Sequence, residues 1–290
     1  MLLAPSAEVN DVVLGVLGRG LTEHVPTATL HAFVFMSNHY HALVSVPDSA
    51  TLSRLLKFVN GEIARRVNKL RDRVGAFWQR RFDSIPVTED LASQRWRLRY
   101  IMAHGVKEAL VGKITDWPGA RSVRWLRDGT KLAGTWTDYT RLGWAKRNKT
   151  PPDPKRYQTR YEVPLYVLPA WKNKPAAYWR RLVRDQVEDI ERAEGERRKT
   201  EELPLPERAS LLCVDPFSRT RSRPRRPAPS ILTLDPALRA EMLRERHKRL
   251  SAWRQASEGA RAAPNTDGGR PWPYADVRTS RHLLPMAHKR

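Results

Sequence analysis

The sequence is poor in cysteine, in acidic residues and in long apolar runs, and each scarcity excludes a class of protein. Cys213 is the only cysteine among 290 residues, which excludes an internal disulfide framework and a cysteine-rich zinc or iron–sulfur site. No run of about 18 or more apolar residues is present, and no basic segment precedes the short apolar stretch near Val13. We therefore expect a soluble cytoplasmic protein of a reducing compartment, without a membrane partner.

Acidic residues are outnumbered, with 31 aspartates and glutamates against 53 lysines and arginines and a net charge of +22. The imbalance begins after residue 50, because residues 1–50 carry one basic and four acidic side chains. A surplus of this size favours an acidic partner such as DNA and argues against a weakly charged metabolic enzyme. Charge alone also fits a basic RNA-binding or ribosome-associated protein.

Prolines are unevenly distributed along the chain, and 17 of the 22 follow residue 150. This shift predicts one domain over residues 1–145 and a basic, proline-rich C-terminal extension over residues 146–290. Two helices are expected in the extension, one after Pro175 and one after Pro236, where apolar residues recur at helical spacing. Both are expected to pack on the main domain rather than to carry a separate activity.

Hydrophobic periodicity in residues 1–145 predicts an α+β fold. The elements expected, in order, are a helix over residues 7–24, strands over 30–36 and 39–46 joined by the turn Ser37-Asn38, a helix from residue 49 or 51 to 70, a strand over 82–87 and a helix over 91–110. This order predicts a ferredoxin-like antiparallel sheet with helices on one face, followed by the partly helical extension.

The triplet His39-Tyr40-His41 lies on the second strand of the expected hairpin. Side chains alternate between the two faces of a strand, so His39 and His41 project to the same side, with Cα atoms about 7 Å apart, and Tyr40 projects to the other. Two imidazoles at this spacing suit one metal ion. By itself, however, such a pair more often consists of hydrogen-bonded surface histidines.

Tyr100 and His104 are four residues apart on the expected helix over residues 91–110, and this spacing puts both side chains on one helix face. The pair offers a phenol nucleophile and a third metal ligand to a common site. The alternative is a core aromatic residue with its hydroxyl at the rim, which is the ordinary role of a tyrosine in such a segment.

Together with the segment between them, these residues resemble the single-tyrosine HUH transposases, and most of all the REP-associated type. The motifs that carry the resemblance are Met36-Ser37-Asn38-His39-x-His41, Trp78-x-x-Arg81-Phe82, Tyr100-Ile101 followed by Val106, and Asp116-Trp117-Pro118 with Ser122. The similarity extends from about Glu8 to Leu126, in the order and spacing of that family.

The resemblance implies a metal-dependent enzyme that cleaves and rejoins DNA. His39 and His41 would be the metal-binding pair, and Tyr100 would form a 5′-phosphotyrosine and free a 3′-hydroxyl. His104, one helical turn beyond Tyr100, is expected as a third metal ligand from its spacing. A covalent protein–phosphate intermediate conserves the energy of the cleaved bond, so no ATP is required. Mixed imidazole and water ligands suit Mg²⁺ or Mn²⁺, and imidazoles also accept Zn²⁺.

Departures from the family pattern support a second hypothesis. His104 stands where relatives usually carry Asn or Gln, and Gly105 stands where they usually carry Pro. Family members open with a strand before the first helix, whereas residues 1–7 are too short and too poor in β-forming residues to supply one. That strand would lie beside the histidine hairpin, so the sheet is expected to lack a member. The alternative function is a catalytically decayed or domesticated DNA-binding protein.

Single-stranded DNA next to a hairpin is the expected partner, because a phenol reaches a splayed strand more readily than a regular duplex. The residues expected to bind it are mostly basic and follow the histidine hairpin: Arg54, Lys57, Arg65, Arg66, Lys69, Trp78, Arg80 and Arg81. The basic helix among them is equally well explained as a solvated face. The protein is expected to be DNA-associated, as a monomer or homodimer.

Overall fold

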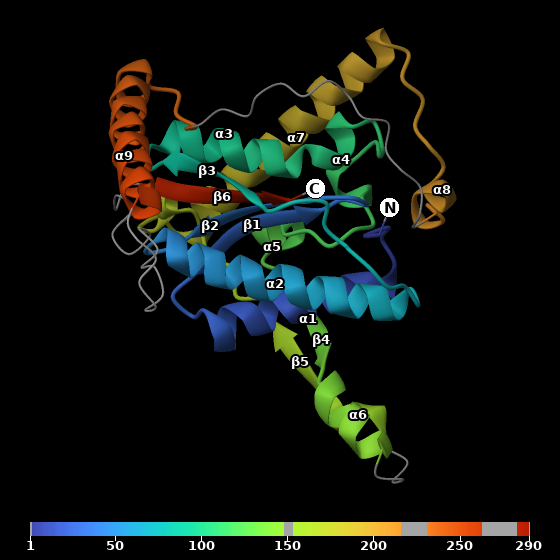
Figure 1. Cartoon of the computed structure of the whole chain (residues 1–290). Helices are drawn as coiled ribbons and strands as arrows, with labels where there is room; N and C mark the ends of the chain where they lie inside the picture. Colours follow the sequence, from blue (N-terminus) through green and yellow to red (C-terminus); the bar gives the residue numbers. More distant parts are fainter. Residues whose placement is uncertain (1, 148–152, 216–230, 263–282, 290) are drawn as a thin grey trace.

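The computed structural model describes residues 2–147, 153–215, 231–262 and 283–289, and Figure 1 shows their arrangement. Helices surround a central antiparallel sheet, and a small helix-tipped hairpin projects from the body. The α+β class and the antiparallel sheet expected from the sequence are confirmed.

Within the described residues, the main sheet has four strands and a second sheet has two. The order in the main sheet is β1 (Thr29–Phe35), β2 (Tyr40–Ser45), β6 (Leu283–Lys289) and β3 (Asp83–Thr88), and each neighbouring pair is antiparallel. The second sheet pairs β4 (Ala133–Thr137) with β5 (Gln158–Glu162).

Helices lie against both faces of the main sheet, which differs from the expectation of helices on one face. On one face lie α1 (Ala7–Arg19) and α2 (Ser49–Leu70), and on the other lie α3 (Leu91–Met102), α4 (His104–Lys107) and α7 (Ala176–Thr200) (Figure 1). Apolar residues of α5 (Val123–Asp128) are buried in the same cluster as those of α3 and α7. Both faces are covered because β1 is apolar on both sides. Phe33 and Phe35 are buried with α1 and α2, whereas Ala32 and Val34 are buried with α3.

The remaining elements are mostly connections. They are the π-helical turn η1 (Gly20–His24) that continues α1, the 3₁₀ turns η2 (Ile114–Asp116), η3 (Pro154–Tyr157) and η4 (Pro169–Trp171), and the helices α6 (Tyr139–Arg147), α8 (Arg208–Leu212) and α9 (Pro236–Ala262). Helices α7 and α9 confirm the two helices predicted after Pro175 and Pro236. Among the helices that the structure describes, none is both long and apolar enough to cross a membrane.

Strand β6 occupies the place in the sheet where a member was expected to be missing. In the described residues 2–6, ahead of α1, no strand is formed. The C-terminal strand lies between β2 and β3 instead, with His41 opposite His288 and Ile85 opposite Met286 in the backbone register. The sheet is therefore four-stranded, and β3 joins it through β6.

The domain boundary expected between residues 145 and 146 falls within a hairpin. Strands β4 and β5 lie on either side of this boundary and pair with each other, with Trp136 opposite Thr159, so the two-stranded sheet contains residues from both predicted parts of the chain. Further along, Trp179 and Val183 of α7 are buried in the same cluster as Leu98 of α3. The first part of the extension thus contributes to the core around the main sheet.

Candidate active site

Side chains of β2 alternate between the sheet face covered by α1 and α2 and the face covered by α3. Tyr40 and Ala42 pack with α1 and α2, and the Tyr40 hydroxyl donates a hydrogen bond to Asn60 Oδ1 of α2 at 3.0 Å. His41 lies between them in the chain and projects to the α3 side, where its ring lies 5.1 Å from that of His39. The alternation predicted for the triplet is therefore found.

Three histidines converge on the α3 side of the sheet. His39 precedes β2, His41 lies on it and His104 begins α4. The ring centroids of His41 and His104 are 4.1 Å apart, and those of His39 and His104 are 5.5 Å apart. One nitrogen from each ring lies within 4.8 Å of the others. His41 and His104 are buried and His39 is half-buried, so the cluster is largely screened from water.

Hydrogen bonds orient two of the three rings. His39 Nδ1 lies 2.6 Å from Asn38 Oδ1, and His104 Nδ1 lies 3.1 Å from the backbone carbonyl oxygen of Tyr100. Both partners are carbonyl oxygens that accept and cannot donate, so each Nδ1 carries the hydrogen and each Nε2 carries the lone pair of the neutral ring. Outer hydrogen bonds of this kind fix the orientation of metal-ligating histidines.

Tyr100 lies beside the histidine cluster on α3. Its ring centroid is 5.3 Å from that of His41 and 4.9 Å from that of His104, with both ring pairs close to perpendicular. Trp96, one turn earlier on the same helix, stacks on Tyr100 with centroids 6.1 Å apart. The structure thus brings His39, His41, His104 and Tyr100 together from distant parts of the chain.

Arg97 and Lys107 lie next to Tyr100, and the sequence motifs did not predict either of them as a site residue. The guanidinium carbon of Arg97 lies 4.8 Å from the centroid of the Tyr100 ring, and Lys107 Nζ lies 5.0 Å from it. Arg97 is buried, and this burial lowers the pKa of its guanidinium to about 10, so the group is charged at neutral pH. Positions 97, 100, 104 and 107 are separated by three or four residues, which is the spacing of one helix face. This spacing in the sequence could have indicated that Arg97 and Lys107 lie on the same face as Tyr100.

The basic residues of α2 lie across the main sheet from Tyr100. Helix α2 packs on the sheet face that carries Tyr40, and Figure 1 shows α2 and α3 on opposite sides of the strands. Arg54 and Lys57 are exposed there, and Arg65 is exposed and forms an ion pair with Glu62. The structure does not bring this row of charges together with Tyr100.

Arg66 and Lys69, two of the residues predicted to bind DNA, instead contact the projecting hairpin. Arg66 is buried, forms an ion pair with Glu62 and donates to the backbone carbonyl oxygen of Thr137 at 2.9 Å. Lys69 Nζ lies 3.7 Å from the centroid of the Tyr139 ring. Helical spacing predicts Arg66 on the outer face of α2, but β4 covers that position, so its guanidinium lies inside the protein.

The segment between α2 and β3 holds the other three predicted contacts. Trp78 is half-buried, and its Nε1 donates to the backbone carbonyl oxygen of Asn60 at 3.0 Å, which ties the indole to α2. Arg80 is exposed and forms an ion pair with Asp83 at 3.0 Å. Arg81 is exposed. Of these three, the two arginines are therefore the ones that the solvent reaches most readily.

The histidine cluster fits a divalent metal ion. His39, His41 and His104 supply three nitrogen donors at mutual distances that one ion can span, and the tautomers fixed at His39 and His104 leave Nε2 as the coordinating atom. Donor sets made of imidazole suit Mn²⁺, Zn²⁺ and other transition metals, whereas Mg²⁺ prefers oxygen ligands.

Comparison with known protein families gives a match to one part of the chain. Residues 23–104 match the family model described as transposase IS200 like, and the matched segment runs from η1 to His104 and includes the three histidines and Tyr100. No curated protein and no solved structure matches the chain.

Proposed function

We propose that this chain, whose residues 23–104 match the model of the IS200-like transposases, is a transposase of this kind that cleaves and rejoins single-stranded DNA through a covalent bond to Tyr100. The observation that carries the proposal is the position of the Tyr100 ring, edge-on to His41 and His104 with centroids 5.3 and 4.9 Å apart. A phenol held against a group of metal-ligating side chains is an arrangement suited to attack on a phosphodiester.

In the proposed reaction, Tyr100 Oη attacks the phosphorus of a DNA phosphodiester. A bond forms between Oη and phosphorus, and the bond from phosphorus to the 3′ oxygen breaks. The phenol loses its proton, and the leaving oxygen takes up a proton to become a 3′-hydroxyl. The product is a 5′-phosphotyrosine, and attack by a 3′-hydroxyl on this ester reverses the step and rejoins DNA without ATP.

Arg97 and Lys107 place positive charge where the reacting phosphate must lie. Their charged groups are 4.8 and 5.0 Å from the centroid of the Tyr100 ring, so both are close to an incoming phosphate. Arg97 is buried and Lys107 is exposed, and a fixed cation screened from water, as Arg97 is, stabilises the negative charge that develops in the transition state. When bound by His39, His41 and His104, a divalent metal would polarise a non-bridging phosphate oxygen.

Single-stranded DNA beside a hairpin is the substrate that this site favours. Tyr100 is half-exposed and lies between Trp96 and the histidines, so its hydroxyl does not extend far from the protein surface. A phosphate of a flexible single strand reaches such a hydroxyl more readily than a phosphate within a regular duplex. Trp96 has 44% of its surface exposed next to this tyrosine and offers a face on which an unstacked base can lie.

The decisive experiment detects the covalent bond. The full chain is incubated with Mn²⁺ and a library of 3′-labelled single-stranded oligonucleotides that contain a hairpin, and the label that remains with protein in a denaturing gel is measured. We expect an adduct with the unchanged chain and with Tyr178→Phe, an exposed tyrosine of α7, and no adduct with Tyr100→Phe. An adduct of equal yield in Tyr100→Phe would overturn the assignment of the nucleophile.

A second measurement addresses the metal without relying on activity. Electron paramagnetic resonance counts bound Mn²⁺, and we expect one tightly bound ion per chain, lost in His41→Ala and kept in His247→Ala, an exposed histidine of α9. Unchanged Mn²⁺ binding in His41→Ala would reject the cluster as the site. If hairpin DNA binds but no adduct forms with any oligonucleotide, the activity is rejected in favour of the decayed, DNA-binding alternative.

A further inference from the structure

The segment from β4 to β5 forms an arm that projects from the body of the protein. It consists of β4, α6, η3 and β5, and Figure 1 shows α6 at its tip, beyond α1 and α2 and away from α3. The catalytic proposal uses none of its residues. Yet the arm carries Trp144, which is 65% exposed, and five described basic residues at or near its tip.

The base of the arm is held tightly against the body. Gly15 of α1 and Gly134 of β4 lie in backbone contact, so a Cβ at either position would collide with the other element. The guanidinium carbon of Arg19 lies 3.5 Å from the centroid of the Trp136 ring, and that of Arg66 lies 4.7 Å from it. These contacts fix the base of the arm against α1 and α2.

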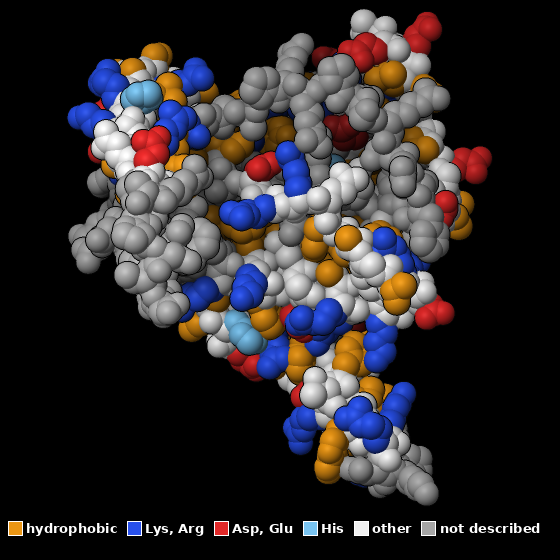
Figure 2. Space-filling model, viewed as in Figure 1, with side chains coloured by type: hydrophobic (Ala, Val, Ile, Leu, Met, Phe, Trp, Pro, Cys, Tyr) orange, Lys and Arg blue, Asp and Glu red, His pale blue; other side chains and the backbone are white. Residues whose placement is uncertain are grey.

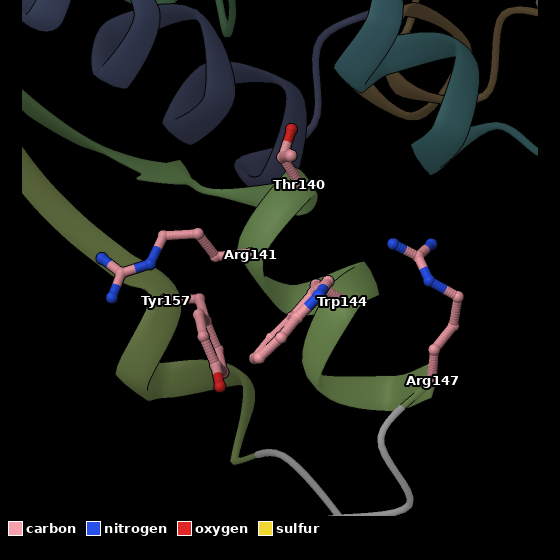
Figure 3. A pocket seen from close by; sticks show the side chains of 5 residues that line it. All are labelled: Thr140, Arg141, Trp144, Arg147 and Tyr157. Carbon is pink, nitrogen blue, oxygen red and sulfur yellow. The ribbon is translucent and has the colours of Figure 1, made fainter.

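The tip contains a slot between two aromatic side chains. Trp144 of α6 and Tyr157 of η3 face each other across a hollow of about 290 Å³, with Thr140 above them in the view of Figure 3 and Arg141 and Arg147 on either side. This volume is at the lower end of the range for small-molecule sites, about 300 Å³, and suits one flat group. The slot thus offers two aromatic faces and two guanidinium groups to a single ligand.

The charge around the slot is positive. The exposed basic side chains are Arg141, Lys146, Arg147, Lys155 and Arg156. The nearby carboxylates of Asp138 and Asp153 accept hydrogen bonds from the backbone N–H groups of Arg141 and Lys155, each at 3.0 Å, and so serve as turn caps. Figure 2 shows Lys and Arg side chains gathered around hydrophobic ones at this end of the molecule.

An aromatic slot flanked by cations matches the chemistry of an unstacked nucleobase with its phosphates. Every base has a π face that stacks on Trp or Tyr, and the phosphates on either side pair with Arg. A base inside a regular duplex already has neighbours on both faces and does not enter such a slot. An acidic peptide matches the arginines but makes no use of two facing rings, so single-stranded DNA is the favoured occupant.

We propose that the slot between Trp144 and Tyr157 binds one unstacked base of single-stranded DNA, while Arg141 and Arg147 contact the adjacent phosphates. The inference rests on the proposed function for its choice of DNA, but it assigns a second site, separate from Tyr100. The arm would hold a segment of DNA at a distance from the bond that is cleaved.

The test measures DNA binding in the Tyr100→Phe background, so that cleavage does not enter. Fluorescence anisotropy gives the Kd for a labelled hairpin with single-stranded flanks. We expect the double variant Trp144→Ala/Tyr157→Ala to bind about 5- to 100-fold more weakly, the loss of one stacked base. Trp253→Ala, which removes a partly exposed tryptophan from α9, is the matched control and should bind as before.

Salt dependence separates the role of the arginines from that of the rings. In Arg141→Ala/Arg147→Ala, the slope of log Kd against log salt should fall by about 1.4, because about 0.7 of a counterion is released per phosphate on a single strand. In Trp144→Ala/Tyr157→Ala the slope should not change. A 5-iododeoxyuridine in the flank should crosslink to Trp144 or Tyr157 on irradiation.

Several outcomes would overturn the inference. They are an unchanged Kd in the double aromatic variant with its circular dichroism intact, an equal loss of affinity for a blunt duplex, tighter slot-dependent binding of the same sequence as RNA, or slot-dependent binding of a polyglutamate peptide. The two proposals fail separately. If no Tyr100 adduct forms but DNA binding depends on the arm, the slot is still supported as a DNA-binding site. If an adduct forms but Trp144→Ala/Tyr157→Ala binds DNA with an unchanged Kd, only the proposal for the slot is rejected.

Discussion

The guanidinium carbon of Arg97 lies 4.8 Å from the centroid of the Tyr100 ring, three residues further along the same helix. Arg97 is buried while Tyr100 is half-exposed, so the guanidinium lies beneath the surface next to a ring that solvent reaches. A buried charge costs free energy unless another group offsets that cost. Under the proposed function, the phosphate of the bound DNA would supply the offsetting charge.

Removal of this charge should slow cleavage far more than it weakens binding. We expect Arg97→Ala to reduce the rate of adduct formation by about 100-fold, the usual loss for one group that stabilises transition-state charge, and Arg97→Lys to restore part of it. Single-turnover kinetics with excess protein measures the rate. Arg99→Ala, on the same helix, is the control, and equal rates in the Arg97 and Arg99 variants would contradict the role given to Arg97.

His31 should make the fold sensitive to mild acid. Its ring is buried on β1, with Nδ1 2.9 Å from the backbone carbonyl oxygen of Val167 and Nε2 2.7 Å from Ser45 Oγ. Burial lowers the pKa of His31 to about 4. An unfolded histidine has a pKa of about 6.5, so between these values the unfolded chain binds a proton that the folded chain does not, and stability falls as the pH falls.

The expected loss is about 3 kcal/mol of unfolding free energy from pH 7 down to pH 4, present in full above pH 6.5. Urea unfolding at a series of pH values measures it. His31→Gln cannot titrate, and its unfolding free energy should depend less steeply on pH over this interval. Parallel curves for the two proteins would show that His31 does not carry the effect.

Strand β6 should be required for the catalytic sheet. A chain shortened to residues 1–282 loses the strand that pairs with both β2 and β3, so β3 is left without its partner in the main sheet. We expect this chain to unfold at a lower temperature and to form no Tyr100 adduct. Addition of a synthetic peptide of residues 283–290 should restore part of both. A shortened chain with unchanged melting and adduct yield would contradict the pairing.

The local elements and the convergence of the site were accessible from the sequence, because each depends on short spacings. Alternation along a strand predicts that His39 and His41 face one way and Tyr40 the other, and helical spacing predicts that Tyr100 and His104 share a face. Their meeting follows from the α+β order, in which α3 packs on the strand that carries His41.

The rest depends on pairings between distant segments, which leave little local signal. Nothing in residues 283–289 specifies a place between β2 and β3. The composition predicts a domain boundary between residues 145 and 146, and only the pairing of β4 with β5 shows that the chain forms a hairpin across it. The same hairpin explains Arg66. Periodicity places it on the outside of α2, and a partner that follows much later in the chain covers it.

The position of β6 sets the order in which the protein can mature on the ribosome. The hairpin of β1 and β2 is made early and β3 follows soon after, but the strand that joins them is translated almost 200 residues later. A nascent chain therefore holds the histidine hairpin with an unpaired edge throughout synthesis. The four-stranded sheet can close only when residues 283–289 have emerged, so the chemistry proposed for Tyr100 would begin only on a finished chain.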